Sequence, residues 1–519
     1  MSFSIKNLDK CKNLPNNKIK FLAEKINFNI NERINKDNKD RICNQINRIA
    51  NEINPCGIAL YNDSDIVLKK HQLSVSNQLI KTRGVIAVHS VGTGKTLTAI
   101  STSQCLLNKN IVENIIVITP TSLQKNFINQ AFQYGLTQKQ IDTYFTFYTI
   151  QGITNSIELG KVSNPSGSLV IIDEAHNLRT LNGSRFNTIN KYVKKASKVL
   201  LLTATPLINY QSDIINLISL VTGNKPISQE KFLTMIANAN TNTNSNSTEF
   251  KEYIDGVFNF YIKDSSVPDP NFPNKKILEI FLPMENSYLK TYEKVEQGQE
   301  NKIKDFRGKN IHVFYNGLRR ASNIIETKSP KVDWIKEKIN SEPDSKYVIF
   351  SHFINMGIVP VMNWLNKIKI PYAHVTGDLS IEERSDAVDQ YNSDKIKVLF
   401  ISKAGSEGLD LKNTQYIIIM ESSWNENSIE QIIGRGVRYK SHETLSKSKR
   451  NVIIYRLYTV KPEEYTNINK ITKLHLLEYK SKTNPDSMMS VDLYLRNYSW
   501  TKQQELDKFE KLLIKNSQH

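Results

Sequence analysis

Residues Val85 to Thr96 read VIAVHSVGTGKT, a short aliphatic run followed by a turn with two glycines and a Lys-Thr pair. The next residues, LTAISTSQCLL, favour a helix. A strand, a glycine turn and a helix N-terminus in this order surround a phosphate chain with backbone N–H groups. The residues that we predict to hold a nucleotide here are Gly92, Thr93, Gly94 and Lys95, with Thr96 as a ligand of Mg²⁺.

This loop departs from the full phosphate-loop pattern at one position. The pattern has a glycine five residues before Gly94, and this chain has His89 there. The GTGKT centre is intact, and the flanking strand and helix favour a nucleotide site over a purely structural turn.

A second candidate element is the run LVIIDEAH, from Leu169 to His176. Four aliphatic residues that end in two acids place the carboxylates at the carboxyl edge of a buried strand, where α/β sheets bind ligands. We expect Asp173 to bind Mg²⁺ and Glu174 to orient and deprotonate the attacking water. His176 completes the DEAH sequence and is a candidate coupling residue.

A strand-end turn lies thirty residues further on. The strand KVLLL ends in Thr203-Ala204-Thr205-Pro206. The two hydroxyls of Thr203 and Thr205 are predicted to bridge the acidic pair to the second half of the chain and so to couple hydrolysis to movement.

A second α/β block carries further candidates. The strand KVLFIS is followed by SKAGSEGLDL, Ser402 to Leu411, in which Gly405 and Gly408 permit a close approach of the backbone to a phosphate chain. Asp410, in the same segment, is a candidate nucleotide contact. A strand with a glycine turn is by itself more often structural.

The segment QIIGRGVR, Gln431 to Arg438, is predicted to be helical. Gln431, Arg435 and Arg438 then fall at i, i+4 and i+7 on one face. Two arginines and a glutamine on one face fit an arginine-finger arrangement that stabilises charge on the transferred phosphoryl group. The alternative is a solvated basic helix.

Alternating strands and amphipathic stretches predict an α/β protein with two parallel sheets. Between the blocks, residues 238–248 form a polar tract that we expect to be a surface loop, and residues 284–325 look helical and basic. The predicted divisions are 1–65 (basic, helical), 66–225 (first α/β domain), 226–330 (linker or insertion), 331–460 (second α/β domain) and 461–519 (helical tail).

Composition narrows the class of protein. The chain has 519 residues and a formal net charge of +18, and the excess is concentrated in residues 1–50, 290–338 and 431–519. Such basic segments indicate a polyanionic partner, and Lys302, Lys304, Arg307 and Lys309 are candidate DNA contacts.

No apolar run is long enough for a membrane span, and the start lacks a signal sequence. The four cysteines show no CxxC pair, so reduced thiols in a cytoplasmic setting are expected.

GTGKT, DEAH, TATP, SKAGSEGLDL and QIIGRGVR, in this order, resemble motifs I, II, III, V and VI of superfamily 2 helicases and translocases. The resemblance implies two RecA-like domains in tandem, with helical additions, and ATP in the cleft between them. Three further segments are similar to family motifs: His71-Gln72 to the motif with the adenine-reading glutamine, Thr119-Pro120-Thr121 to motif Ia, and Phe350-Ser351-His352 to motif IV. In these segments Gln72, Pro120, Thr121 and Ser351 are the candidate contacts.

A narrower resemblance follows the last motif. RYKSH, Arg438 to His442, and the tail SVDLYL, Ser490 to Leu495, are similar to the DNA-dependent ATPases of poxviruses and other large cytoplasmic DNA viruses, of the nucleoside triphosphatase I and early transcription factor small subunit type. This implies DNA as partner, with RNA possible, a viral RNA polymerase or transcription factor subunit, and a location in host cytoplasm, viral factory or virion.

The resemblance favours an ATP-driven motor on DNA, with Mg²⁺, in viral transcription initiation, elongation or termination. Two alternatives remain. One is a strand-separating DNA or RNA helicase in replication or RNA processing, because the motor motifs are shared. The other is a catalytically inactive DNA-binding subunit, which the presence of Lys95, Glu174 and Arg435 disfavours.

Overall fold

The chain is described by a computed structural model, which divides into two compact units, Met1–Asp264 with Lys508–His519, and Ser265–Asp507. We call these unit 1 and unit 2. The described residues are 11, 14–25, 28–53, 68–180, 183–207, 209–240, 247–262, 269–305, 311–403, 405, 409–473 and 488–517.

Unit 1 contains a six-stranded sheet of order β3-β2-β4-β5-β1-β6, in which every pair is parallel. The central strands are runs of aliphatic residues because both faces of the sheet are covered. The strands are β1 (Gly84–His89), β2 (Asn114–Ile118), β3 (Phe145–Tyr148), β4 (Ser168–Asp173), β5 (Lys198–Thr203) and β6 (Phe258–Tyr261).

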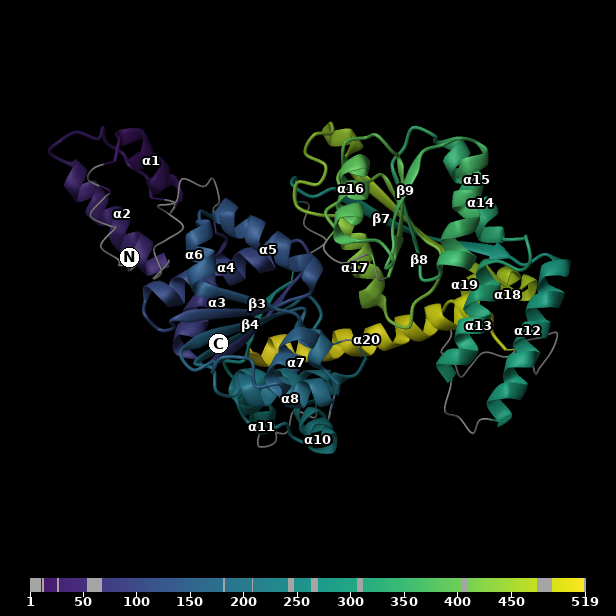
Figure 1. Ribbon diagram of the computed structural model, residues 1–519, viewed down its shortest axis with the longest axis horizontal. Helices are drawn as coiled ribbons and strands as arrows, with labels where there is room; N and C mark the ends of the chain where they lie inside the picture. The colour runs from purple at the N-terminus through teal and green to yellow at the C-terminus, as the bar shows by residue number, and fades with distance from the viewer. Residues whose placement is uncertain are drawn as a thin grey trace. The chain divides into compact units, whose positions relative to one another are not determined.

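Helices cover both faces of this sheet (Figure 1). The helices of unit 1 are α3 (Lys70–Lys81), α4 (Lys95–Asn108), α5 (Thr121–Tyr134), α6 (Gln138–Tyr144), α7 (Ile150–Glu158), α8 (Ser184–Val193), α9 (Ile214–Thr222), α10 (Gln229–Asn240) and α11 (Ser247–Ile254), with short 3₁₀ turns η2 (Ala175–Leu178) and η3 (Gln211–Asp213). Side chains from α3, α4 and α5 form one buried core with β1, β2 and β4, and α9 contacts β1 and β5.

Unit 2 repeats this plan with a six-stranded parallel sheet of order β7-β12-β11-β8-β10-β9. Its strands are β7 (Asn274–Pro283), β8 (Tyr347–Ser351), β9 (Tyr372–Val375), β10 (Val398–Ser402), β11 (Tyr416–Ile419) and β12 (Asn451–Val460). Both units are therefore parallel α/β domains, and the prediction of two RecA-like domains in tandem is confirmed.

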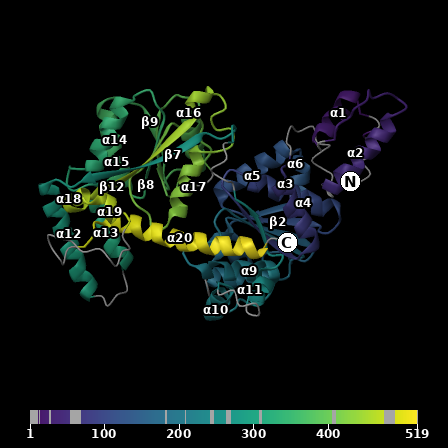
Figure 2. The same ribbon diagram turned by 180° about the vertical axis from the view of Figure 1, so that it is seen from behind.

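The helices of unit 2 also lie on both sheet faces, as Figure 2 shows from behind. They are α12 (Asn286–Asp305), α13 (Ile311–Asn323), α14 (Pro330–Ser341), α15 (Val359–Lys367), α16 (Ile381–Asn392), α17 (Glu426–Gly436), α18 (Pro462–Thr466) and α19 (Ile468–Ile471), with short segments η4 (Ile354–Ile358) and η5 (Lys447–Lys449). One core contains side chains of α16 and α17, and another contains side chains of α14 and α15.

The last helix, α20 (Val491–Ser517), belongs to unit 2 up to Asp507 and to unit 1 from Lys508. Within unit 1 its Phe509 ring lies 6.0 Å from Phe232 and 6.3 Å from Phe250, measured between ring centroids. Aromatic contacts with α10 and α11 therefore hold the end of this helix.

The N-terminal region contains α1 (Asn16–Lys25) and α2 (Lys39–Ile53), which contact one another. A buried cluster of apolar residues and cysteines fills the space around them. The expectation of reduced thiols is wrong here, because Cys11 and Cys43 form a disulfide with Cα atoms 5.8 Å apart. Among the described residues no cysteine is free.

Every strand that we predicted is present, and three further strands were missed. These are β3, β6 and β7, whose sequences are short or mix polar and apolar residues. Of the polar tract 238–248, residues 238–240 end α10, 247 and 248 begin α11, and 241–246 lie outside the described residues. Within the described part of the chain, no helix combines the length and apolar character needed to cross a membrane.

Candidate nucleotide site

The glycine loop lies between β1 and α4, as the sequence predicts. Gly92 and Gly94 have φ of 77° and 87°, the left-handed region that favours glycine. A Cβ on Gly94 would lie 2.6 Å from Nε2 of Gln72. The backbone conformation therefore favours glycine at position 94, and a Cβ there would also force the Gln72 amide to shift.

Helix α4 begins directly at Lys95, so its unpaired N-terminal amides face the loop. The Nζ atom of Lys95 donates to the carbonyl oxygen of His89 at 3.2 Å. Thr96 is the second residue of the helix and is half-buried. The arrangement presents a cation, a hydroxyl and helix N–H groups to an anion.

Two side chains of α3 hold the loop backbone. The Nε2 atom of His71 donates to the carbonyl of Thr93 at 3.1 Å. The amide of Gln72 donates to the carbonyls of Thr93 and Gly94 at 3.5 and 3.4 Å. Gln72, predicted to read adenine, is therefore hydrogen-bonded to the phosphate loop itself.

His89, which replaces the first glycine of the pattern, is fully buried. Its Nε2 atom donates to Oδ1 of Asn259 on β6 at 3.2 Å. Burial lowers the pKa of His89 to about 4, although the bond to Asn259 opposes the shift. The imidazole is therefore neutral at pH 7 and packs beneath the loop.

The acidic pair follows β4. Asp173 is 7% exposed, and its carboxylate accepts from the Thr119 hydroxyl at 3.5 Å and from the backbone N–H of Glu174 at 3.0 Å. Burial and then the Glu174 carboxylate raise the pKa of Asp173 to about 7, while Lys95 lowers it. The phosphate-loop lysine and this carboxylate thus interact electrostatically.

Glu174 has φ of 50°, which is uncommon outside glycine and turns the chain sharply after the strand. Its Oε2 atom lies 3.3 Å from Nδ1 of His176. The same Nδ1 lies 3.4 Å from the hydroxyl of Thr203 at the end of β5. Thr203 in turn accepts from the N–H of Thr205 at 3.1 Å. A polar chain therefore links the DEAH turn to the TATP turn.

The oxygen donors of Thr96 and Asp173 fit Mg²⁺, which prefers one or two carboxylates together with substrate phosphates. The buried Asp173 carboxylate, beside Lys95, has a raised pKa, which a bound cation would lower. These residues would hold the metal.

Helix α5 begins at Thr121, and only Thr119 and Pro120 separate it from the end of β2. Pro120 occupies the N-cap position, and the Thr121 side chain is exposed. Their position at the carboxyl edge of the sheet is compatible with the predicted nucleic-acid contact, which stays a prediction.

Unit 2 carries Gln431 and Arg435 on α17, both half-buried. Helix α17 ends at Gly436, so the prediction that Arg438 continues the same helical face is wrong. Arg438 instead donates to the carbonyl of Leu409 at 3.1 Å, and its Nη1 atom lies 3.4 Å from Oδ1 of Asp410. Arg438 and Asp410, two predicted site residues, are thus paired.

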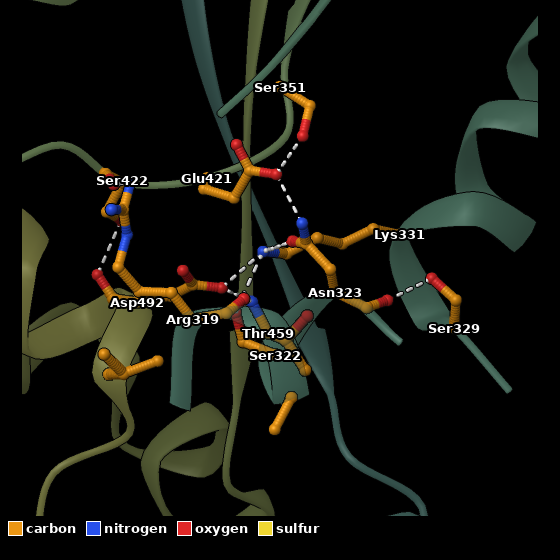
Figure 3. A network of polar contacts seen from close by, with 12 residues as sticks. Arg319, Ser322, Asn323, Ser329, Lys331, Ser351, Glu421, Ser422, Thr459 and Asp492 are labelled. Atoms are coloured by element: carbon orange, nitrogen blue, oxygen red, sulfur yellow. Dashed lines mark hydrogen bonds and ion pairs between the residues drawn. The ribbon is translucent and has the colours of Figure 1, made fainter. Parts of the chain in front are cut away.

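Ser351, predicted from motif IV to contact nucleic acid, is fully buried at the end of β8. Figure 3 shows its hydroxyl directed at Glu421, whose carboxylate accepts from both Ser351 and Asn323. The side chain of Ser351 therefore serves a buried polar network in this structure.

Other predicted contacts lie partly outside the described residues. Gly405 is described, and a Cβ there would lie 2.1 Å from the carbonyl oxygen of Val375 on β9. The absence of a side chain at Gly405 therefore lets the backbone there lie close to β9. Gly408, Arg307 and Lys309 lie outside the described residues, as do the side chains of Lys302 and Lys304.

No sequence pattern indicated Asn259, and none assigned roles to His71 and His89. Thr119, the first residue of the motif Ia segment, donates its hydroxyl to Asp173, a contact that the motif does not indicate. Asn259 lies on β6, and its contact with His89 depends on a strand pairing that no local pattern indicates.

Three family models match the chain. The helicase conserved C-terminal domain matches residues 330–440, the type III restriction enzyme res subunit matches 65–208, and the SNF2-related domain matches 137–329. Together they span residues 65–440.

Relatives from large DNA viruses match along most of the chain. A putative ATP-dependent RNA helicase of Acanthamoeba polyphaga mimivirus, L538, is 33% identical over 460 residues, which cover 84% of this chain and 99% of the relative. Nucleoside triphosphatase I of Choristoneura fumiferana entomopoxvirus is 24% identical and covers 80% and 76%. A solved Sulfolobus solfataricus SWI2/SNF2 ATPase core in complex with dsDNA covers 87% and 98%, with 18% identity and a TM-score of 0.37.

These findings indicate the same family. The chain has two parallel α/β units, with a phosphate loop and a DEAH turn in unit 1. Helicase family models match it, and a viral helicase relative matches it along nearly the whole length of that relative. The chain therefore belongs to the superfamily 2 helicases, close to nucleoside triphosphatase I of large DNA viruses, and is a nucleic-acid-dependent ATPase or helicase.

Proposed function

We propose that this protein hydrolyses ATP with Mg²⁺ to drive movement along DNA, and that it acts in viral transcription. The observation that carries the proposal is the DEAH turn, in which the Glu174 carboxylate lies 3.3 Å from His176 and interacts electrostatically with the buried Asp173 carboxylate. The relatives named nucleoside triphosphatase I support the viral setting.

Each residue has a defined task in this proposal. Lys95 and the N-terminal amides of α4 bind the phosphates. Thr96 and Asp173 hold Mg²⁺, which neutralises charge on the phosphates when bound. Glu174 orients water and accepts its proton, and His176 holds the Glu174 carboxylate in position from the side of Thr203.

Arg435 of α17 supplies positive charge to the transferred phosphoryl group during the cycle. The pair Arg438–Asp410 positions the segment that follows α17. The chain from Glu174 through His176 to Thr203 then transmits the state of the nucleotide to the TATP turn. Gln72 couples binding of the base to the conformation of the loop, because its amide donates to the loop carbonyls.

The test is phosphate release by the purified full chain with Mg²⁺ and ATP, in the presence of single-stranded DNA, duplex DNA or RNA. We expect DNA to stimulate release and Glu174→Gln to reduce the stimulated rate by about 10²-fold or more while ADP still binds. Glu158→Gln, an exposed carboxylate at the end of α7, is the matched control. A stimulated rate that Glu174→Gln leaves unchanged would show that the site is assigned wrongly.

A strand-separating RNA helicase is the second candidate, since mimivirus relatives are named putative ATP-dependent RNA helicases. It predicts stimulation by RNA rather than DNA and displacement of a labelled strand from an RNA duplex. Stimulation by DNA without strand displacement would favour the translocase, and the reverse pattern would favour the helicase. Co-purification of a viral RNA polymerase subunit tests the transcription role.

A further inference from the structure

Tyr261, the last residue of β6, lies where the phosphate loop begins. In the pairing of β6 with β1, Tyr261 is opposite His89, and its carbonyl accepts the N–H of Ser90 at 3.0 Å. Ser90 in turn accepts the hydroxyl of Thr93 at 2.7 Å. The backbone of Tyr261 therefore holds the first residue of the loop.

The side chain of Tyr261 acts on the other end of the loop. Its ring stacks on His71 with centroids 3.6 Å apart and ring planes 9° apart. The Nε2 atom of the same His71 ring donates a hydrogen bond to the carbonyl oxygen of Thr93 at 3.1 Å. Because a stacked ring cannot tilt freely, Tyr261 fixes the direction of this hydrogen bond.

A third group completes the cluster. The His89 ring lies edge-on to His71 with centroids 5.2 Å apart, and its Nε2 is held by Asn259, two residues before Tyr261 on the same strand. Asn259 also donates to the side chains of Ser74 and Gln78 on α3. Strand β6 is thus fixed to α3, which carries His71 and Gln72.

From these contacts we propose that Tyr261 is a positioning residue for nucleotide binding, which acts by stacking on His71 and so orders the phosphate loop. The inference rests on the proposed nucleotide site. Tyr261 acts through His71 and not by direct contact with a phosphate. The usual phosphate loop has a glycine at the position of His89. The larger, buried His89 ring is held by Asn259 of β6, and we infer that Tyr261 of the same strand helps to order the loop around it.

The test is the equilibrium affinity of a fluorescent ADP analogue, with Mg²⁺, for the full chain. Tyr261→Leu keeps an apolar side chain and removes the ring. An aromatic pair contributes about 0.5–1.5 kcal/mol, so we expect the dissociation constant to rise about two- to tenfold. Tyr261→Phe keeps the ring and should stay within about twofold of the wild type.

A double-mutant cycle distinguishes positioning from general destabilisation. In a His71→Ala background the stacking partner is absent, so Tyr261→Leu should add less than about twofold. Ile262→Ala, at the exposed neighbour of Tyr261, is the control and should bind as the wild type does. Thermal melting of each variant checks that the unit is folded at the assay temperature.

Clear outcomes overturn the inference. Wild-type affinity in Tyr261→Leu, or an equal fold-change in both His71 backgrounds, would show that Tyr261 does not act through His71. If ADP binds normally but no nucleic acid stimulates hydrolysis, the motor activity is refuted. The double-mutant cycle of Tyr261 and His71 still tests the positioning role, because it is measured by ADP affinity. A wild-type chain that binds no ADP would overturn both.

Discussion

The Nζ atom of Lys331 lies 2.6 Å from Oδ2 of Asp492, and neither side chain is exposed to solvent. Lys331 is the second residue of α14 and Asp492 the second residue of α20, so the pair joins two helices within unit 2. Figure 3 shows that the network around this pair also includes Asn323 and Thr459. The N–H of Thr459 donates to the same carboxylate oxygen at 3.0 Å.

Breaking this pair should strongly destabilise unit 2. Lys331→Met leaves the Asp492 carboxylate buried without its cation, and a buried charge without a partner costs about 3–5 kcal/mol. The double variant Lys331→Met/Asp492→Asn removes both charges and should recover much of that loss. Chemical denaturation with a probe in unit 2 measures both free energies of unfolding.

The pair Lys397–Asp344 provides the control. Its Nζ–Oδ1 distance is 2.8 Å, but the Asp344 side chain is 99% exposed. Exposed pairs contribute about 0–1 kcal/mol, so Lys397→Met should change little. Equal losses in the two single variants would contradict the assigned role of burial.

Gly405 should tolerate no side chain. A Cβ would meet the carbonyl oxygen of Val375 at 2.1 Å and the carbonyl carbon at 2.5 Å, and backbone atoms of a paired strand cannot move aside. We expect Gly405→Ala to destabilise unit 2 by about 1–3 kcal/mol. Gly298→Ala, in α12 with open space around it, should stabilise by about 1 kcal/mol. A neutral Gly405→Ala, measured by thermal melting, would contradict the packing role.

Arg435 should affect the chemical step more than nucleotide affinity. A finger that stabilises only transition-state charge contributes on the order of 10³-fold to kcat. Arg435→Ala should therefore lower kcat for DNA-stimulated hydrolysis and leave the ADP dissociation constant within about threefold. Lys412→Ala, an exposed cation in the same unit, is the matched control. A proportional rise in the ADP dissociation constant would instead assign Arg435 to ground-state binding.

The nucleotide half of the site could be predicted from sequence because its parts are local. Strand, glycine turn and helix are contiguous from Val85 to Leu107, and the DEAH acids end a strand with an unbroken aliphatic run. Parallel pairing then places both strand ends at one edge of the sheet.

The remainder depends on contacts between distant segments. The role of Tyr261 requires the pairing of β6 with β1, and β6 is a four-residue strand with no alternating pattern. Ser351 was expected at a nucleic-acid surface, but its burial depends on Glu421, seventy residues away. The helix boundary at Gly436, which separates Arg438 from Arg435, is likewise a detail that periodicity does not fix.

Acid should weaken unit 2 partly through His352. Burial, followed by the nearby Arg319 and Lys403, lowers the pKa of His352 to about 3. The Glu421 carboxylate is occupied with the backbone N–H of His352. The unfolded chain binds a proton near its ordinary pKa of about 6.5, so stability falls as pH decreases through 6.5 toward 3. Between pH 7.5 and 5 this group alone should lower the free energy of unfolding by about 2 kcal/mol. The variant His352→Phe should lose that part of the pH dependence, which chemical denaturation at each pH measures. An unaltered slope would contradict the assignment.

Reduction should selectively unfold the N-terminal helices α1 and α2. Their core is small, and domains of about 40 residues usually need a disulfide. The Cys11–Cys43 bridge closes a separation of 32 residues, which stabilises by about 3–4 kcal/mol in the chain-entropy model. Amide hydrogen exchange on the variant Cys11→Ser/Cys43→Ser should lose protection in both helices, while β1 and β5 stay protected. The same result is expected for wild-type protein in reductant. Full protection of α2 without the bridge would show that the apolar contacts around Ile42 and Ile46 suffice to hold it.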